Sequence, residues 1–111
     1  MLKKKERLKR ADFSHFFSLG KRIHTPYFTI VFVPYTTSHG SVVVSKKIAR
    51  KAVDRNTLRR RIYDILRREL RADAPKGVYI LLVKKEALGA SHKVLLETFV
   101  KAVRSFAHKK Q

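Results

Sequence analysis

The chain has 111 residues, of which 44% are hydrophobic, and a formal net charge of +19. This length predicts one domain with a modest core, and the hydrophobic share excludes disorder by composition. The lack of cysteine excludes disulfides and thiolate metal sites, and no window has the roughly eighteen successive apolar residues of a membrane span. The charge predicts a polyanionic partner. We therefore expect a cytoplasmic nucleic-acid-binding protein, with DNA and RNA both open at this point.

The N-terminal segment, residues 1–10, carries six basic residues and one acid. It has no apolar stretch after its basic residues, so it does not resemble a signal peptide. We expect a mobile arm that becomes ordered on a phosphate backbone.

A short helix is predicted next, with Asp12 as its cap and Gly20 just past its end. Phe13, Phe16 and Phe17 are spaced so that they share one helix face. Such a face can pack into a core, or it can offer aromatic rings to unpaired bases. Both interpretations hold if the helix exposes part of its aromatic face.

Four segments have the composition of β-strands. Tyr27–Val33 is rich in β-branched and aromatic residues, and Lys21–His24 is a candidate edge strand. Ser41–Ser45 is almost continuously apolar, which predicts burial on both faces. Val78–Val83 is the most hydrophobic segment and is expected to be a central strand.

The most basic stretch, Lys46–Arg71, has eleven Lys and Arg residues against three acids. Its core predicts a helix with two unlike faces. The apolar stripe consists of Leu58, Ile62, Ile65 and Leu66. The polar and basic residues are Asn56, Arg60, Arg61, Tyr63, Arg67, Arg68 and Arg71, with Arg55 and Arg59 near the edge of the stripe. The acids are too few to neutralise this face, and we interpret it as a surface for a polyanion rather than a solvated face.

A last helix is predicted after Ser91, which is suited to its N-cap. Its apolar face is formed by Leu95, Leu96, Phe99, Val100, Val103 and Phe106. The order of elements is then α-β-β-β-α-β-α, an α+β sandwich with helices packed on a single sheet.

Catalytic groups are not recognisable in the chain. The eight acids are scattered, the five histidines have no ligand-like spacing, and the four glycines form no phosphate loop. Asp64 lies among basic residues and is expected to form local ion pairs. We expect no catalytic residue and no metal ligand, so the chain is predicted to bind rather than to catalyse.

The run Arg55-Asn56, followed by Arg59-Arg60 and preceded by VVVSKK, resembles the bacterial ribonuclease P protein subunit. The segment RLKRADFSHFFSLGKR, the strand GVYILLV and the final amphipathic helix match the same family in place and type. The resemblance implies the fold of ribosomal protein S5 domain 2, with a left-handed βαβ crossover. The length and the lack of an internal repeat or domain boundary predict one RNA-binding domain over residues 1–111.

Functional roles are likewise implied by this resemblance. The implied partners are the catalytic RNA of ribonuclease P and the 5′ leader of precursor tRNA. The catalytic RNA would perform the hydrolysis with bound magnesium, which the holoenzyme RNA requires. The implied RNA-subunit contacts are Arg55, Asn56, Arg59 and Arg60, with Arg61 and Arg67 as further candidates. The implied leader-binding cleft contains Phe13, Phe17, Lys46 and Lys47.

The chain departs from the family pattern at Thr57 and Tyr63, which stand where basic residues are usual. Arg61 and Arg67 can replace that charge, and Tyr63 can stack on a base or donate from its hydroxyl. The alternatives are a ribosomal or rRNA-binding protein, a basic DNA-binding protein and a stand-alone nuclease. A helix that reads DNA usually offers several amide or hydroxyl side chains among its arginines, and here only Asn56 is available.

Overall fold

The structure is a computed structural model that describes residues 10–71 and 74–108. Its elements in chain order are α1 (Arg10–Leu19), β1 (Lys21–His24), β2 (Phe28–Pro34), β3 (His39–Val43), α2 (Ala52–Arg71), β4 (Gly77–Val83), the 3-10 helix η1 (Lys85–Gly89) and α3 (His92–His108). The predicted order of helices and strands is confirmed, and η1 is an addition to it. The predicted N-terminal arm lies almost entirely outside the described residues.

The four strands form one sheet in the order β1-β2-β4-β3. The pairs β1–β2 and β2–β4 are antiparallel, whereas β3 and β4 are parallel. Parallel neighbours need a crossover connection, and α2 provides it. β4 lies between β2 and β3, which confirms that the most hydrophobic segment is a central strand. The left-handed crossover implied by the resemblance stays a prediction.

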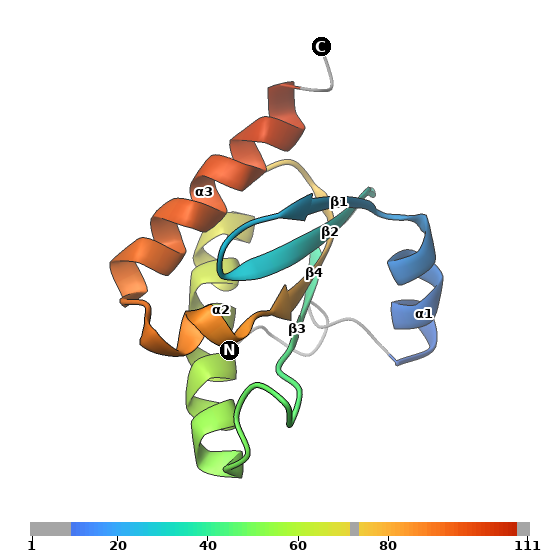
Figure 1. Ribbon diagram of the computed structural model, residues 1–111. Helices are drawn as coiled ribbons and strands as arrows, with labels where there is room; N and C mark the ends of the chain where they lie inside the picture. The colour runs from blue at the N-terminus through green and yellow to red at the C-terminus, as the bar shows by residue number, and fades with distance from the viewer. Residues whose placement is uncertain (1–9, 72–73, 109–111) are drawn as a thin grey trace.

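Helices cover both faces of the sheet, with α1 on one face and α2 and α3 on the other (Figure 1). Successive strand residues point to opposite faces. In β2, Phe28 and Ile30 therefore join the core under α2 and α3, while Val31 joins a smaller cluster with Val78 and Ile80 beneath α1. Both clusters are buried, so the sheet is packed on both faces and holds the surrounding residues in fixed positions.

The long helices have the predicted apolar faces. The stripe of α2 is buried, with Leu58, Ile62, Ile65 and Leu66 between 0% and 4% exposed. At the start of α3, the Ser91 hydroxyl accepts a hydrogen bond from the Val94 N–H at 3.2 Å, which confirms the predicted N-cap. The side chain of Phe106, expected on the apolar face of α3, lies outside the described part of the chain.

Gly20 sets how α1 lies on the sheet. Its N–H donates to the Phe16 carbonyl at 3.0 Å, which ends the helix where the sequence predicted. Its backbone is not in the left-handed region, so the reason for glycine is steric. A Cβ atom at Gly20 would lie 2.2 Å from Cγ1 of Val31. The close approach lets the end of α1 rest directly on β2.

One prediction about the strands is wrong. β3 runs from His39 to Val43, so it begins and ends two residues earlier than the predicted strand. It is also an outer strand of the sheet rather than one buried on both faces. Val42 is buried under α2, but Val43 on the opposite face is only half-buried. A run of three valines does not reveal how far a helix extends over the sheet. None of the described helices is both long and apolar enough to cross a membrane.

Candidate nucleic-acid interface

The face of the sheet beneath α1 has an apolar end and a cationic edge. Strand pairing places Arg22 beside Val31, and Val43 beside Leu82, on this face. α1 packs on the end formed by Val31, Val78 and Ile80. Because β3 and β4 are parallel, both strands end at the same edge of the sheet. Lys46 and Lys47, after β3, and Lys84, after β4, therefore follow that one edge. We call this surface the α1-side face.

An aromatic cluster connects α1 to this face. The rings of Phe13 and Phe17 stack with centroids 5.6 Å apart and an interplanar angle of 18°. The guanidinium carbon of Arg22 lies over the Phe17 ring, 4.4 Å from its centroid, a distance at which a cation is attracted to the ring. Both phenylalanines are half-buried. The core and stacking interpretations are therefore compatible, because each ring packs on the cluster beneath α1 and remains partly exposed.

Arg22 is a candidate site residue that the sequence prediction did not include. Its strand, β1, has only four residues, and the direction of alternate side chains depends on the pairing register, which places Arg22 opposite Val31. The sequence offered one indication: Arg22 and His24 are two residues apart in a strand, so both polar side chains point to the same face of the sheet. His24 in turn contacts the Thr29 hydroxyl through Nδ1 at 3.0 Å.

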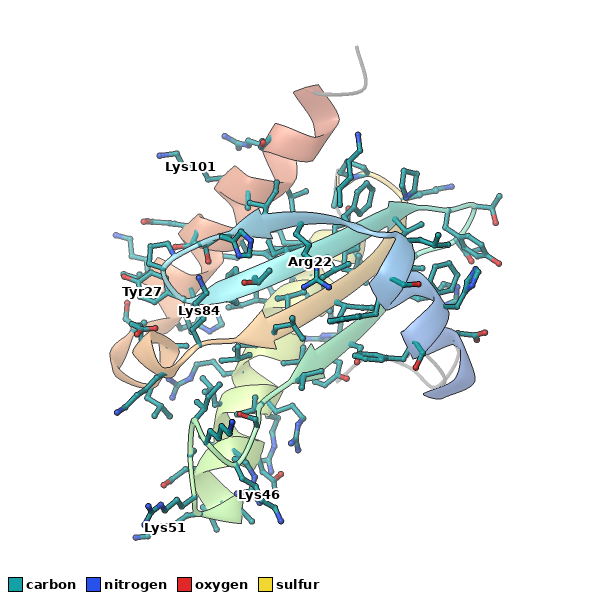
Figure 2. The ribbon with its side chains drawn as sticks, turned by 45° about the vertical axis from the view of Figure 1, so that its right-hand side comes forward. Arg22, Tyr27, Lys46, Lys51, Lys84 and Lys101 are labelled. Atoms are coloured by element: carbon teal, nitrogen blue, oxygen red, sulfur yellow. The ribbon has the colours of Figure 1, made fainter. Side chains whose placement is uncertain are left out.

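The predicted cleft lysines lie apart from the aromatic rings. Lys46 and Lys47 are exposed in a turn beyond the end of β3. Figure 2 shows Arg22 next to α1 and Lys46 near the start of α2. Lys84 is held at the same sheet edge by a hydrogen bond from its ammonium group to the Thr25 carbonyl at 2.7 Å. The rings lie on α1 and the lysines lie beyond the end of β3, and the leader-binding cleft that would combine them stays a prediction.

The second surface is the basic face of α2, formed by Asn56, Arg59, Arg60, Arg61 and Arg67. Arg60 and Arg61 are exposed, and a guanidinium group keeps its charge throughout the physiological pH range. Arg59 donates to the Asn56 side-chain oxygen at 2.8 Å, which fixes both groups relative to each other. Arg60 lies at the centre of this face and borders a hollow on each side.

Two of the predicted RNA-facing arginines make bonds within the protein. Arg55 donates from Nη1 to the carbonyls of Ala49 and Arg50, at 2.9 and 2.7 Å, and so braces the loop before α2. Arg67 donates to the Asp64 carboxylate at 2.8 Å, which confirms the expected ion pair. The Arg67 hydrogen bond is the main reason that the pKa of Asp64 is lowered from its ordinary value, with further attraction from Arg68 and His92.

Tyr63, one of the two departures from the family pattern, is hydrogen-bonded to the sheet. Its hydroxyl accepts a hydrogen bond from the Val42 N–H of β3 at 3.2 Å. Its ring also borders a shallow hollow with Asn56, Arg59 and Arg60. The other departure, Thr57, is exposed and donates to the Val53 carbonyl at 2.9 Å within α2. Among the described residues, no group of three or more histidines and acids is placed to hold a metal ion.

Comparison with known proteins identifies the family. A protein-family model described as Ribonuclease P matches residues 2–107. The chain belongs to the ribonuclease P family. A ribonuclease P protein component from a Nitratiruptor species is 28% identical over 101 residues, which cover 91% of each chain.

Solved structures of the family have the same fold. The ribonuclease P protein from Thermotoga maritima is similar with a TM-score of 0.79 and 28% identity, over 90% of this chain and 96% of that one. The Staphylococcus aureus protein gives a TM-score of 0.76 at 20% identity, over 92% and 94% of the two chains. The expected small mixed α/β fold is confirmed. The chain is a protein component of ribonuclease P, an RNA-binding protein of tRNA processing, and the ribosomal and DNA-binding alternatives are not supported.

Proposed function

We propose that the protein binds two RNA molecules in the cytoplasm, each with its own surface. The basic face of α2 binds the RNA subunit of ribonuclease P. The α1-side face binds the single-stranded 5′ leader of precursor tRNA. The RNA subunit carries out the hydrolysis with its own magnesium, and this chain contributes no catalytic residue or metal ligand. The proposal rests on one observation: the α1-side face and the basic face of α2 are two cationic surfaces on opposite sides of one sheet.

The α1-side face suits a single strand because it combines partly exposed rings with separated cations. Proteins that bind single strands stack bases on aromatic side chains and follow the backbone with basic groups. Phe13 and Phe17 supply the rings, and Arg22 adds a charge directly beside them. Lys46 and Lys47 supply charge further along the strand path. A strand of several nucleotides would contact both groups under this proposal.

The α2 face suits a folded RNA because its arginines stand on a rigid helix. Arg59 and Asn56 fix each other, and Arg60 and Arg61 extend from the same helix into solvent. Arginine presents several N–H donors in a planar arrangement that matches phosphate oxygens. Arg55 contributes indirectly under this proposal, because its bonds to the preceding loop hold the start of α2 and the neighbouring turn with Lys46 and Lys47.

A protein between two RNA molecules also lowers their electrostatic repulsion. Precursor tRNA and the RNA subunit are both polyanions, and their close approach is unfavourable unless cations lie between them. A chain with a net charge of +19 supplies such cations. The preference for precursor over mature tRNA then comes from leader contacts alone, because mature tRNA lacks the leader.

The test is to reconstitute the protein with a bacterial ribonuclease P RNA at low magnesium and to measure 5′ cleavage of a precursor tRNA. We expect faster cleavage with protein than without it. Arg60→Ala should weaken binding to the RNA subunit, whereas Phe13→Ala should mainly reduce the preference for precursor over mature tRNA. Stacking of one base contributes about 1–3 kcal/mol, so this preference should fall by a factor of about 5 to 150.

Two outcomes would contradict the proposal. If the protein does not increase cleavage at any magnesium concentration, it does not act as a ribonuclease P subunit with that RNA. If Phe13→Ala lowers affinity for precursor and mature tRNA equally, the α1-side face does not bind the leader. Cleavage by the protein without RNA would instead support a stand-alone nuclease.

A further inference from the structure

A hollow between α2 and α3 is not explained by the two surfaces described so far. It has a volume of about 410 Å³ and is lined by Thr57, Arg60, Arg61, Asp64 and His92. Four of these residues come from α2, and His92 comes from the first turn of α3. Small-ligand sites have volumes of about 300–1,000 Å³, so the hollow has room for a nucleotide-sized group.

The charge of the hollow is positive. Arg60 and Arg61 are both exposed at its border. Asp64 is the one acid in the lining, and its carboxylate is paired with Arg67 at 2.8 Å. This pairing leaves the charges of Arg60 and Arg61 available to an external anion.

His92 adds a donor from a second helix. It is half-buried, and it is close enough to Asp64 to contribute to the lowering of that carboxyl's pKa. The Ser91 hydroxyl already caps the start of α3 through the Val94 N–H. His92 is the residue of α3 that lines the hollow.

We propose that this hollow binds a phosphodiester group of the ribonuclease P RNA subunit, with Arg60, Arg61 and His92 as donors. The inference rests on the proposed function, because it extends the RNA-subunit contact from α2 to α3. Because α2 and α3 pack on the same core, the helices that carry these donors keep a fixed position relative to each other. The donors therefore select a backbone that passes between α2 and α3 and position the RNA relative to both helices. The Thr57 hydroxyl donates its hydrogen bond to the Val53 carbonyl, so it lines the hollow but is not counted among the donors.

The test compares His92→Ala with Lys101→Ala. Lys101 is exposed on the same helix, as Figure 2 shows, and nine residues at 100° each place it on the opposite side from His92. Affinity for a bacterial ribonuclease P RNA transcript is measured by filter binding between 50 and 200 mM salt. A hydrogen bond to a charged group contributes at least about a factor of ten, and we expect that loss for His92→Ala at low salt. The loss for Lys101→Ala should be smaller, although it removes a full charge.

The salt dependence gives a second measurement. Each phosphate contact contributes about 0.7–0.9 to the slope of log affinity against log salt. Over this fourfold range of salt, His92→Lys, which places a charged donor at this position, should therefore lose about threefold more affinity than His92→Ala. His92→Lys should also restore most of the affinity at low salt. Thermal unfolding of the His92 variants should match wild type, because the side chain is only half-buried.

The outcomes separate this inference from the proposed function. If wild type does not bind the RNA transcript, the proposed function is wrong and the inference falls with it. If wild type binds, but His92→Ala and Lys101→Ala have the same affinity and slope, only the α2–α3 phosphate site is refuted. A loss in His92→Ala that His92→Lys does not reduce would also refute a phosphate contact.

Discussion

Replacing Gly20 by alanine should separate α1 from the sheet. The added Cβ would lie 2.2 Å from Cγ1 of Val31, which is 1.2 Å less than the 3.4 Å at which ordinary contact begins. Val31 is fully buried, and the Phe16 carbonyl and Phe32 amide nitrogen, each 3.3 Å from the Cβ position, leave no room to turn away. The end of α1 therefore has to move, and the rings of Phe13 and Phe17 move with it.

The size of the effect follows from two opposing contributions. Overpacking of this kind costs about 1–3 kcal/mol. Replacing glycine by alanine in an allowed conformation stabilises by about 0.4–1 kcal/mol, because the unfolded chain loses freedom. We expect Gly20→Ala to lower the free energy of unfolding by about 1–2 kcal/mol. Val31→Ala alone should cost about 2 kcal/mol, because it removes two buried methyl groups and leaves a small cavity.

A double-mutant cycle distinguishes this contact from general destabilisation. In the Val31→Ala background the obstructing Cγ1 is gone, so Gly20→Ala should cost nothing or stabilise slightly. The coupling energy from urea unfolding should then be about 1–3 kcal/mol. If the two effects add within about 0.5 kcal/mol, Gly20 is not required by Val31. Under the proposed function, Gly20→Ala should also reduce the precursor preference, and the double variant should recover it.

Two further predictions concern tyrosines. Tyr63→Phe removes the acceptor of the Val42 N–H. It should lower the free energy of unfolding by about 1 kcal/mol, with little change in affinity for RNA. Unchanged urea unfolding would contradict the role of this bond. The buried hydroxyl of Tyr79 donates to the Pro75 carbonyl, and burial raises the pKa of Tyr79 above its ordinary value. Because the unfolded tyrosine ionises first, stability should be complete below about pH 10 and fall at higher pH. Tyr79→Phe should lose stability less steeply than wild type between about pH 10 and 12, and parallel curves would argue against this assignment.

Periodicity predicted the parts of the fold that depend on local sequence. The stripe of Leu58, Ile62, Ile65 and Leu66 follows from helix geometry, and its burial is confirmed. Ser91 as a cap follows from its hydroxyl and the apolar residues after it. The burial of β3 was not predictable in this way. Val42 and Val43 lie in an outer strand and Val44 follows it, because a run of apolar residues does not specify how far α1 extends over them.

The candidate site was predictable in residue type but only partly in role. The basic face of α2 follows from charge, yet the bonds of Arg55 to the preceding loop and of Arg67 to Asp64 depend on distances that spacing alone does not give. Arg22 was missed because the register of a four-residue strand decides which face it occupies. The assignments of Phe13 and Phe17 came from a family resemblance, and their RNA contacts stay predictions.

The bond between Tyr63 and β3 has a consequence for self-association. An outer strand presents backbone groups that can pair with a strand from another copy of the chain. The outward Val42 N–H is instead bonded to a side chain from α2, and α2 packs along this strand. At the opposite edge of the sheet, β1 carries Lys21 and Arg22, and charged edge residues repel a second copy. Both features disfavour the addition of a strand from a second copy of the chain at the two outer strands of the sheet.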